Sequence, residues 1–271
     1  MSNIFKSLIH YPKNKWLQFG FAVANLSNIL GIRLLHYARQ LITHRFYAFE
    51  HEKYTSELVE LNQKIQIELK LQKKEYPNLR YSFGYPYQGL NTLGVFGARS
   101  TEDRWHLYGL SEYLNASDKI LDIGCNCGFM SIYSSYRTGC KAECIDINNH
   151  MLNIGRYCAE MMRIDDKILF INSDFTNFKN EKQYQVVFSF AAHHTEDKQH
   201  QPDLRVYFEK IYRLLSDSGL LVFESHGYDL NDPNFQENIE NMRDLFDVVS
   251  HKYIFEGQRE LFYFRKNNDG L

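Results

Sequence analysis

The stretch Lys-Ile-Leu-Asp-Ile-Gly-Cys-Asn-Cys-Gly-Phe-Met, residues 119–130, constrains the fold of this chain more than any other. A short apolar run ends at Asp122, and Gly124 and Gly128 follow before a new helical pattern begins. Glycine permits the left-handed backbone of a tight turn and lets another backbone or a ligand approach closely. A strand, such a turn and a helix start are typical of α/β folds that bind nucleotides.

Asp146 is the second informative residue. It lies at the end of an apolar run, 142–147, that only Glu143 interrupts. In nucleotide-binding α/β folds an acid at the end of the second strand accepts hydrogen bonds from both ribose hydroxyls. We therefore expect Asp146, with Ile147 beside it, to hold a nucleoside.

The motif resembles that of the class I S-adenosylmethionine-dependent methyltransferases, which reads Asp/Glu-x-Gly-x-Gly-x-Gly. Here it is Asp122-Ile-Gly124-Cys-Asn126-Cys-Gly128, and asparagine tolerates a left-handed backbone in place of the middle glycine. The competing dinucleotide fingerprint spaces its glycines as Gly-x-Gly-x-x-Gly, which this chain does not do. The resemblance implies S-adenosylmethionine as cofactor, with these four residues at its methionine part.

The pattern after residue 100 alternates between strands and helices. Strands are expected at 119–123, 142–147, 168–172, 185–190, 220–225, 248–254 and 260–264, and helices at 129–137, 151–162, 203–215 and 235–246. Such alternation favours a parallel sheet covered on both faces, and the short connection at 256–259 favours an antiparallel hairpin at its edge. The resemblance implies a doubly wound, mostly parallel seven-stranded sheet of the Rossmann-like methyltransferase type.

The resemblance leaves an N-terminal helical and aromatic-rich extension, residues 1–98, before the cofactor-binding domain at 99–271. No acidic residue precedes Glu50, and the uncharged stretch 17–32 is shorter than the ~20 residues that a membrane span needs. A basic amphipathic helix within residues 1–45 is expected either to lie on an anionic membrane or to pack on the catalytic domain.

The rest of this extension divides into two segments. Residues 51–75 have the apolar spacing of a charged helix, which the Pro77 region ends. The aromatic and glycine-rich segment 81–96 is read either as a wall over the acceptor or as a loop packed on the domain's flank. A capped helix start is expected at 100–103.

Three further strand ends carry polar residues or an aromatic ring. Asp174 and Phe175 follow the third strand, and the resemblance implies that they contact the adenine ring; a turn residue is the alternative for Asp174. His193 and His194 follow the fourth strand, where an imidazole can take a proton from a hydroxyl or simply form a hydrogen-bonding wall. Glu224, after the fifth strand, is read as a second acid or a substrate contact.

Composition excludes several classes of protein. All five cysteines lie between Cys125 and Cys158, in a spacing that matches neither a disulfide framework nor a standard zinc motif. We therefore expect a reducing compartment and no metal. The net charge of −2 gives the chain no general attraction to polyanions, which disfavours a nucleic-acid substrate.

These observations together predict a cytoplasmic methyltransferase that acts on oxygen of a small molecule, a glycan or a lipid-linked intermediate, with membrane association left open. Two alternatives remain. Methylation of RNA or of a terminal phosphate is one, because the Asp-Ile-Gly-Cys-Asn wording also resembles RNA-end methyltransferases. A non-catalytic methyltransferase-like module in a larger assembly is the other. The sequence does not predict the oligomeric state.

Overall fold

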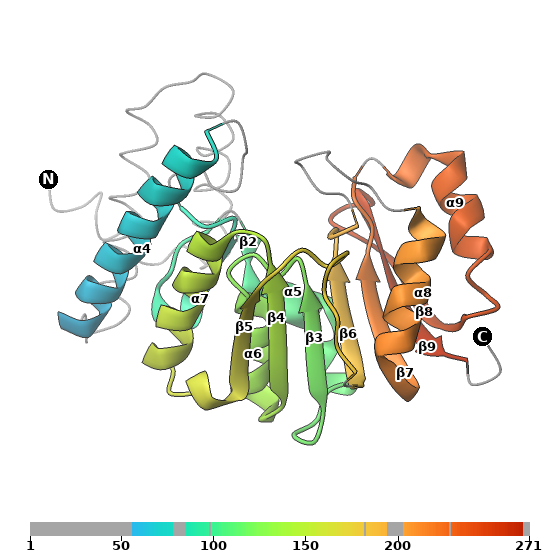
Figure 1. Ribbon diagram of the computed structural model, residues 1–271, viewed down its shortest axis with the longest axis horizontal. Helices are drawn as coiled ribbons and strands as arrows, with labels where there is room; N and C mark the ends of the chain where they lie inside the picture. The colour runs from blue at the N-terminus through green and yellow to red at the C-terminus, as the bar shows by residue number, and fades with distance from the viewer. Residues whose placement is uncertain are drawn as a thin grey trace, which may run out of the picture. The chain divides into compact units, whose positions relative to one another are not determined.

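The main feature of the computed structural model is a seven-stranded sheet with the order β5-β4-β3-β6-β7-β9-β8 (Figure 1). The structure describes residues 56–77, 85–97, 99–181, 183–193, 203–227 and 229–267. The strands are β3 (Lys119–Ile123), β4 (Lys141–Asp146), β5 (Ile168–Asn172), β6 (Tyr184–Phe190), β7 (Leu215–Glu224), β8 (Phe246–Ile254) and β9 (Arg259–Lys266). Strand β9 is antiparallel to both of its neighbours, β7 and β8, and all other pairings in this sheet are parallel. The predicted mostly parallel seven-stranded sheet is confirmed.

Helices cover the sheet on both faces. They are α4 (Ser56–Glu75), α5 (Thr101–Tyr108), α6 (Phe129–Thr138), α7 (Asn149–Met161), α8 (Leu204–Leu214) and α9 (Pro233–Glu240). The crossover through α6 runs from β3 toward one sheet edge, and that through α8 runs from β6 toward the other. Right-handed crossovers then place α6 and α8 on opposite faces (Figure 1). The order of the strands reverses between β3 and β6. At such a switch point α/β sheets bind their ligands.

The interior of the sheet is almost wholly apolar. In β3, Ile120, Leu121 and Ile123 are buried, as a strand covered on both faces requires. Aromatic rings fill the space between β7, β9 and α8; the ring centroids of Phe208 and Phe223 lie 5.1 Å apart. This packing fixes the strands, and with them the positions of the side chains at their ends.

The last predicted helix is shorter than expected. Helix α9 ends at Glu240, whereas the apolar spacing predicted a helix over 235–246. Beyond Glu240 the chain continues in turns, in which the Met242 amide donates to Ile239 O at 3.2 Å. Met242 and Leu245 remain buried. Turns preserved the apolar spacing, so the pattern alone could not distinguish them from a helix. The helices predicted at 129–137, 151–162 and 203–215 are present with slightly different ends.

The described part of the extension also packs tightly. Helix α4 confirms the predicted helix from Ser56 onward and buries Leu61, Ile65 and Leu69. Residues 85–97 contain β1 (Gln88–Gly89) and the 3₁₀ turn η1 (Asn91–Leu93), and β1 pairs with β2 (Arg99–Ser100). A Cβ on Gly97 would lie 2.1 Å from Gly89 N, so two backbones touch here. Residues 81–84 lie outside the described residues.

Residues Glu60–Leu271 form one compact unit. Within this unit α4 packs on α7 through polar contacts described below. The division of the chain at residue 99 stays a prediction. Residues 1–45, the expected membrane contact, lie outside the described part of the chain. No described helix is both long and apolar enough to cross a membrane.

Candidate functional site

The turn between β3 and α6 has a left-handed backbone at all three motif positions. The φ angles are 61° at Gly124, 56° at Asn126 and 66° at Gly128. A Cβ on Gly124 would lie 2.8 Å from the Ala192 Cβ, and one on Gly128 would lie 2.9 Å from Phe170 Cε1. Asn126 accepts a hydrogen bond from the Cys127 amide through its own Oδ1 at 3.0 Å, which supports its unusual backbone. The turn therefore requires the residues that the motif supplies.

A third glycine, from another helix, also lies against this turn. Gly155 lies within α7, and a Cβ there would lie 2.3 Å from the Cys127 carbonyl oxygen. Helix α7 thus contacts the turn directly. The sequence gave no reason to select Gly155, because its partner lies in another element.

Asp146 joins two turns through its carboxylate. Oδ2 accepts the Asn126 amide at 2.8 Å, and Oδ1 accepts the Asn148 amide at 2.8 Å. Burial raises the pKa of this carboxyl to about 6, although the two amides act in the opposite direction. Each oxygen keeps a second lone pair for an outside donor. Ile147, beside it, is partly buried.

Asp122 lies behind the same turn. It is buried, accepts a hydrogen bond from Ser131 Oγ at 2.7 Å, and has a pKa raised by burial to about 7. The positive charge of Arg104 lowers that pKa, and the negative charge of Asp146 raises it. Two carboxyl groups with raised pKa values, Asp122 and Asp146, therefore lie against one turn.

The third strand end is more exposed. Asp174 accepts the Thr176 amide at 2.7 Å, which is the turn role that the sequence left as its alternative. Phe175 is partly buried, packs against Tyr207 with ring centroids 5.3 Å apart, and carries Lys210 Nζ 4.7 Å above its ring. The structure places both residues at the same sheet edge as Asp146, since β4 and β5 are parallel neighbours.

The turn between β3 and α6 and the residues around it suit a nucleoside cofactor. Three glycine positions keep side chains away from the turn, and the Asp146 carboxylate lies beside it. The Nδ2 of Asn148 is buried and has no hydrogen-bond partner among the described residues. A buried donor of this kind calls for an outside acceptor. The residues present thus suit a polar ligand with hydroxyl and acceptor groups.

His193 lies on the other side of the switch point. It is buried, its Nε2 lies 2.9 Å from Asp229 Oδ2, and its ring lies 5.0 Å from that of Phe223. Asp229 also accepts the His226 amide at 2.5 Å. His194 lies outside the described residues. The structure thus gives the predicted histidine a carboxylate partner that the sequence did not single out.

Glu224, at the end of β7, lies in a buried ionic cluster. Its Oε2 accepts Arg104 Nη2 at 2.8 Å and the Tyr108 hydroxyl, and its Oε1 accepts Arg259 Nη1. Burial would raise the pKa of Glu224, but the two arginines bring it below its ordinary value. Glu224 is therefore an ionised acceptor, and a role as proton donor does not suit it near neutral pH.

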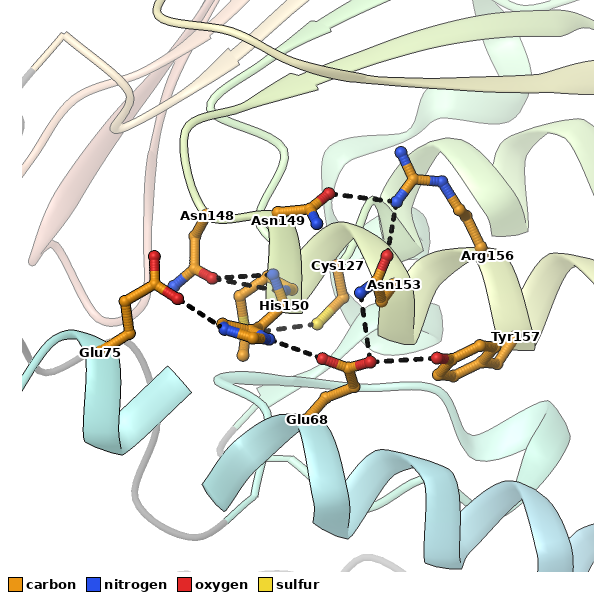
Figure 2. Close-up of polar contacts among 10 residues, drawn as sticks. Glu68, Glu75, Cys127, Asn148, Asn149, His150, Asn153, Arg156 and Tyr157 are labelled. Carbon is orange, nitrogen blue, oxygen red and sulfur yellow. Dashed lines mark hydrogen bonds and ion pairs between the residues drawn. The ribbon is translucent and has the colours of Figure 1, made fainter. Parts of the chain in front are cut away.

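A second polar cluster, which the sequence did not predict, joins α4 to α7 (Figure 2). His150 Nδ1 lies 2.6 Å from Glu68 Oε2, and its Nε2 lies 2.9 Å from Glu75 Oε2. The other oxygen of Glu68 accepts Asn153 Nδ2 at 3.1 Å and the Tyr157 hydroxyl at 3.0 Å. These contacts hold α4 against the first turn of α7, close to Asp146.

The described residues contain no group of three or more histidine, cysteine or acidic side chains placed to hold a metal ion. The five cysteines are free and buried, so they fill space in the core.

Comparison with known proteins gives consistent matches. A family model described as a methyltransferase domain matches residues 120–219. A sterol 24-C-methyltransferase of Pneumocystis carinii is 25% identical over 214 residues, which cover 74% of this chain and 55% of the relative. One of Debaryomyces hansenii is 24% identical over 151 residues, covering 55% of this chain and 38% of the relative.

Among solved structures, a methyltransferase of Thiobacillus denitrificans in complex with S-adenosyl-L-homocysteine has a TM-score of 0.45 at 15% identity, over 55% of this chain and 66% of that one. The chain spans about half the length, or less, of the two sterol methyltransferases that it matches.

Proposed function

Since this chain belongs to the class I S-adenosylmethionine-dependent methyltransferases, we propose that it transfers a methyl group from S-adenosylmethionine to a small-molecule acceptor. One observation carries the proposal: the left-handed turn at Gly124, Asn126 and Gly128 adjoins the Asp146 carboxylate, which accepts the Asn126 amide at 2.8 Å. A close backbone and a carboxylate together are what a nucleoside site requires.

The chain's own residues divide the work of holding the cofactor. Asp146 would accept hydrogen bonds from the ribose hydroxyls, and the turn from Asp122 to Gly128 would contact the methionine part. Asp174 and Phe175 would contact the adenine ring. When bound, the cofactor supplies an electrophilic sulfonium methyl group, so the protein needs mainly to position the acceptor.

For a hydroxyl acceptor the protein must also remove a proton. His193 supports this role, because it is buried at the end of β6 and its Nε2 lies 2.9 Å from the Asp229 carboxylate. A carboxylate partner fixes the orientation of an imidazole and stabilises its protonated form. His194 remains a second candidate for the same role.

Two acceptor atoms are consistent with this site. Transfer to oxygen is supported by the His193–Asp229 pair. Transfer to carbon is supported by the relatives, whose names describe 24-C-methylation of sterols. Once an acceptor is known, NMR of the methylated product distinguishes them. His193→Ala should slow transfer to a hydroxyl by about 10²–10⁴-fold without changing cofactor affinity.

The extension, residues 1–98, is proposed to contact the acceptor or a membrane, in a protein located in the cytoplasm. Sedimentation of the full chain with anionic and neutral vesicles tests the membrane part. Binding to anionic vesicles that falls with added salt would support it.

Calorimetric titration with S-adenosylmethionine and S-adenosylhomocysteine, with NAD as a control ligand, tests the main proposal. We expect saturable binding of the two sulfur nucleosides alone. Asp146→Asn should weaken it, and Asp165→Asn, an exposed aspartate at the opposite sheet edge, should not. A folded wild-type protein without such binding would contradict the proposal and support the non-catalytic module.

A further inference from the structure

We propose that the acceptor carries an oxyanion, a phosphate or carboxylate group, that binds to Arg99 and Arg104 beside Glu224. This inference rests on the proposed function, and it names the chemical class of acceptor that the methyltransferase takes. The same guanidinium chemistry binds both kinds of oxyanion.

The first observation is an excess of positive charge. The guanidinium groups of Arg104 and Arg259 pair with the carboxylate of Glu224, and Arg104 and Glu224 are 4% and 0% exposed. Arg99 makes no contact with this carboxylate but lies near enough to interact with it electrostatically. One carboxylate neutralises one of these three charges. Tyr108, which donates to the same carboxylate, adds no negative charge because burial raises its pKa well above the ordinary value.

The second observation is that two of these guanidinium groups have nitrogen atoms to spare. Nη1 of Arg104 and Nη1 of Arg99 are buried, and neither has a hydrogen-bond partner within the described part of the chain. Buried guanidinium donors are normally satisfied, and an orphaned one requires an explanation. An oxyanion between them would supply both the acceptor atoms and the missing negative charge.

The third observation is that Arg99 is held in place without being neutralised. Its guanidinium carbon lies 4.0 Å from the centroid of the Phe255 ring, and its side chain makes no ion pair with a described residue. Phe255 and Glu256 have φ angles of 52° and 57°. Both residues lie in the hairpin turn between β8 and β9, which requires left-handed residues. This turn brings the Phe255 ring against the Arg99 guanidinium.

The position of the cluster suits an acceptor. Glu224 ends β7, Arg259 begins the antiparallel β9, and Arg104 lies 5.7 Å from the ring of Phe190 at the end of β6. All of these residues lie near the carboxyl ends of the parallel strands, on the β7 side of the switch point. The cofactor residues lie on the β3, β4 and β5 side. The two sites adjoin, because Phe190 of β6 pairs with Glu224, and Ser189 just before it pairs with Ile123 of β3.

The test uses inorganic pyrophosphate, phosphate and acetate as probes of the full chain, by calorimetry at constant ionic strength, with S-adenosylhomocysteine titrated in parallel. The decisive variant is Arg99→Met, which keeps the aliphatic stem and breaks no ion pair, so the fold should persist. Arg243→Met is the matched control, since Arg243 is exposed and, among the described residues, pairs with the equally exposed Glu240 three positions earlier.

We expect saturable binding of at least one probe, weakened at least about tenfold by Arg99→Met and unchanged by Arg243→Met, with equal affinity of both variants for S-adenosylhomocysteine. Preference for the phosphates over acetate would assign a phosphorylated acceptor, and the reverse a carboxylate. Equal binding by wild type and Arg99→Met, or no binding of any probe, would overturn the inference.

Two other outcomes concern the cofactor. Loss of S-adenosylhomocysteine affinity in Arg99→Met would overturn the inference, because the arginine would then serve the carboxylate of the cofactor itself. Absence of S-adenosylhomocysteine binding in the wild-type protein would overturn the proposed function, whereas failure of the anion probes alone would leave that function standing.

Discussion

Carboxyl groups at the carboxyl ends of the strands have opposite pKa shifts in the two halves of the sheet, the β3–β4 half and the β7–β9 half. Under the β3–α6 turn, Asp122 and Asp146 have pKa values that burial raises to about 7 and about 6. At the end of β7, Glu224 is as buried as Asp122 but has a pKa below its ordinary value, because Arg104 and Arg259 outweigh its burial. Burial alone therefore does not decide the charge of a carboxylate; its neighbours do.

The difference separates what each half can bind. The β3–β4 half presents carboxyl groups with few cations nearby, which suits a ligand that donates hydrogen bonds. The β7–β9 half presents guanidinium groups with too few anions, which suits a ligand that accepts them. The proposed cofactor site and the proposed oxyanion site thus lie on either side of the switch point between β3 and β6.

Removal of Glu224 should have the largest effect. Glu224→Ala leaves Arg104 and Arg259 buried without their carboxylate, and breaking a buried ion pair in this way costs about 3–5 kcal/mol. Urea unfolding measures the change in the free energy of unfolding. Glu240→Ala, which breaks an exposed pair with Arg243, is the control and should leave the midpoint unchanged. A stable Glu224→Ala protein would mean that the arginines do not depend on this carboxylate.

Gly155→Ala should have the next largest effect, this time on the β3–β4 half. The added Cβ would lie 2.3 Å from the Cys127 carbonyl oxygen, so α7 must move away from the turn. We expect a loss of about 1–3 kcal/mol of stability and a weaker affinity for S-adenosylhomocysteine. Gly227→Ala is a control, because a Cβ there has only one neighbour, at 3.7 Å. Unchanged affinity in Gly155→Ala would show that the turn does not depend on α7.

Asp146 should make cofactor affinity depend on pH. Its carboxylate accepts hydroxyl hydrogens best when ionised, and its pKa is raised to about 6. Affinity for S-adenosylhomocysteine should therefore be constant well above pH 6 and fall, by up to about tenfold per pH unit, well below it. Asp146→Asn should weaken binding by about 1–3 kcal/mol and remove this dependence. If the dependence persists in Asp146→Asn, the titrating group is another one, and Asp122 is the nearest candidate.

The sequence predicted the β3–β4 half much better than the other. The turn at 124–128 and the acid at Asp146 are local features, because glycine spacing and the end of an apolar run lie within a few residues of one another. His193 was selected for the same reason, by its place after a strand. These predictions needed only the order of elements along the chain.

The β7–β9 half depends on contacts between distant residues. Glu224 was predicted as an acid or substrate contact, but its partners Arg104 and Arg259 come from α5 and from the start of β9. Nothing in the spacing of these residues indicates that they meet. Gly155 and the contact of Glu68 with His150 escaped prediction in the same way, since each depends on which helix faces lie together.

The smallest expected effect concerns His150, which supports the β3–β4 half from α4. Burial acts to lower its pKa, but hydrogen bonds with Glu68 and Glu75 raise it above 6.5 overall. The protonated form therefore holds α4, and its contribution is complete below 6.5 and lost as the pH rises through the raised value. Because Glu75 is exposed, solvent screens part of this attraction.

Hydrogen exchange of the α4 amides, corrected for the intrinsic rate, measures this effect between about pH 6 and about pH 8.5. We expect protection of α4 to fall over this range while that of α8, whose charged partners are arginine and carboxylates, stays constant. His150→Gln should abolish the difference, because glutamine keeps a hydrogen-bond donor without a titrating charge. If hydrogen-exchange protection of α4 does not change with pH in the wild-type protein, the apolar contacts of Leu61, Ile65 and Leu69 hold this helix by themselves.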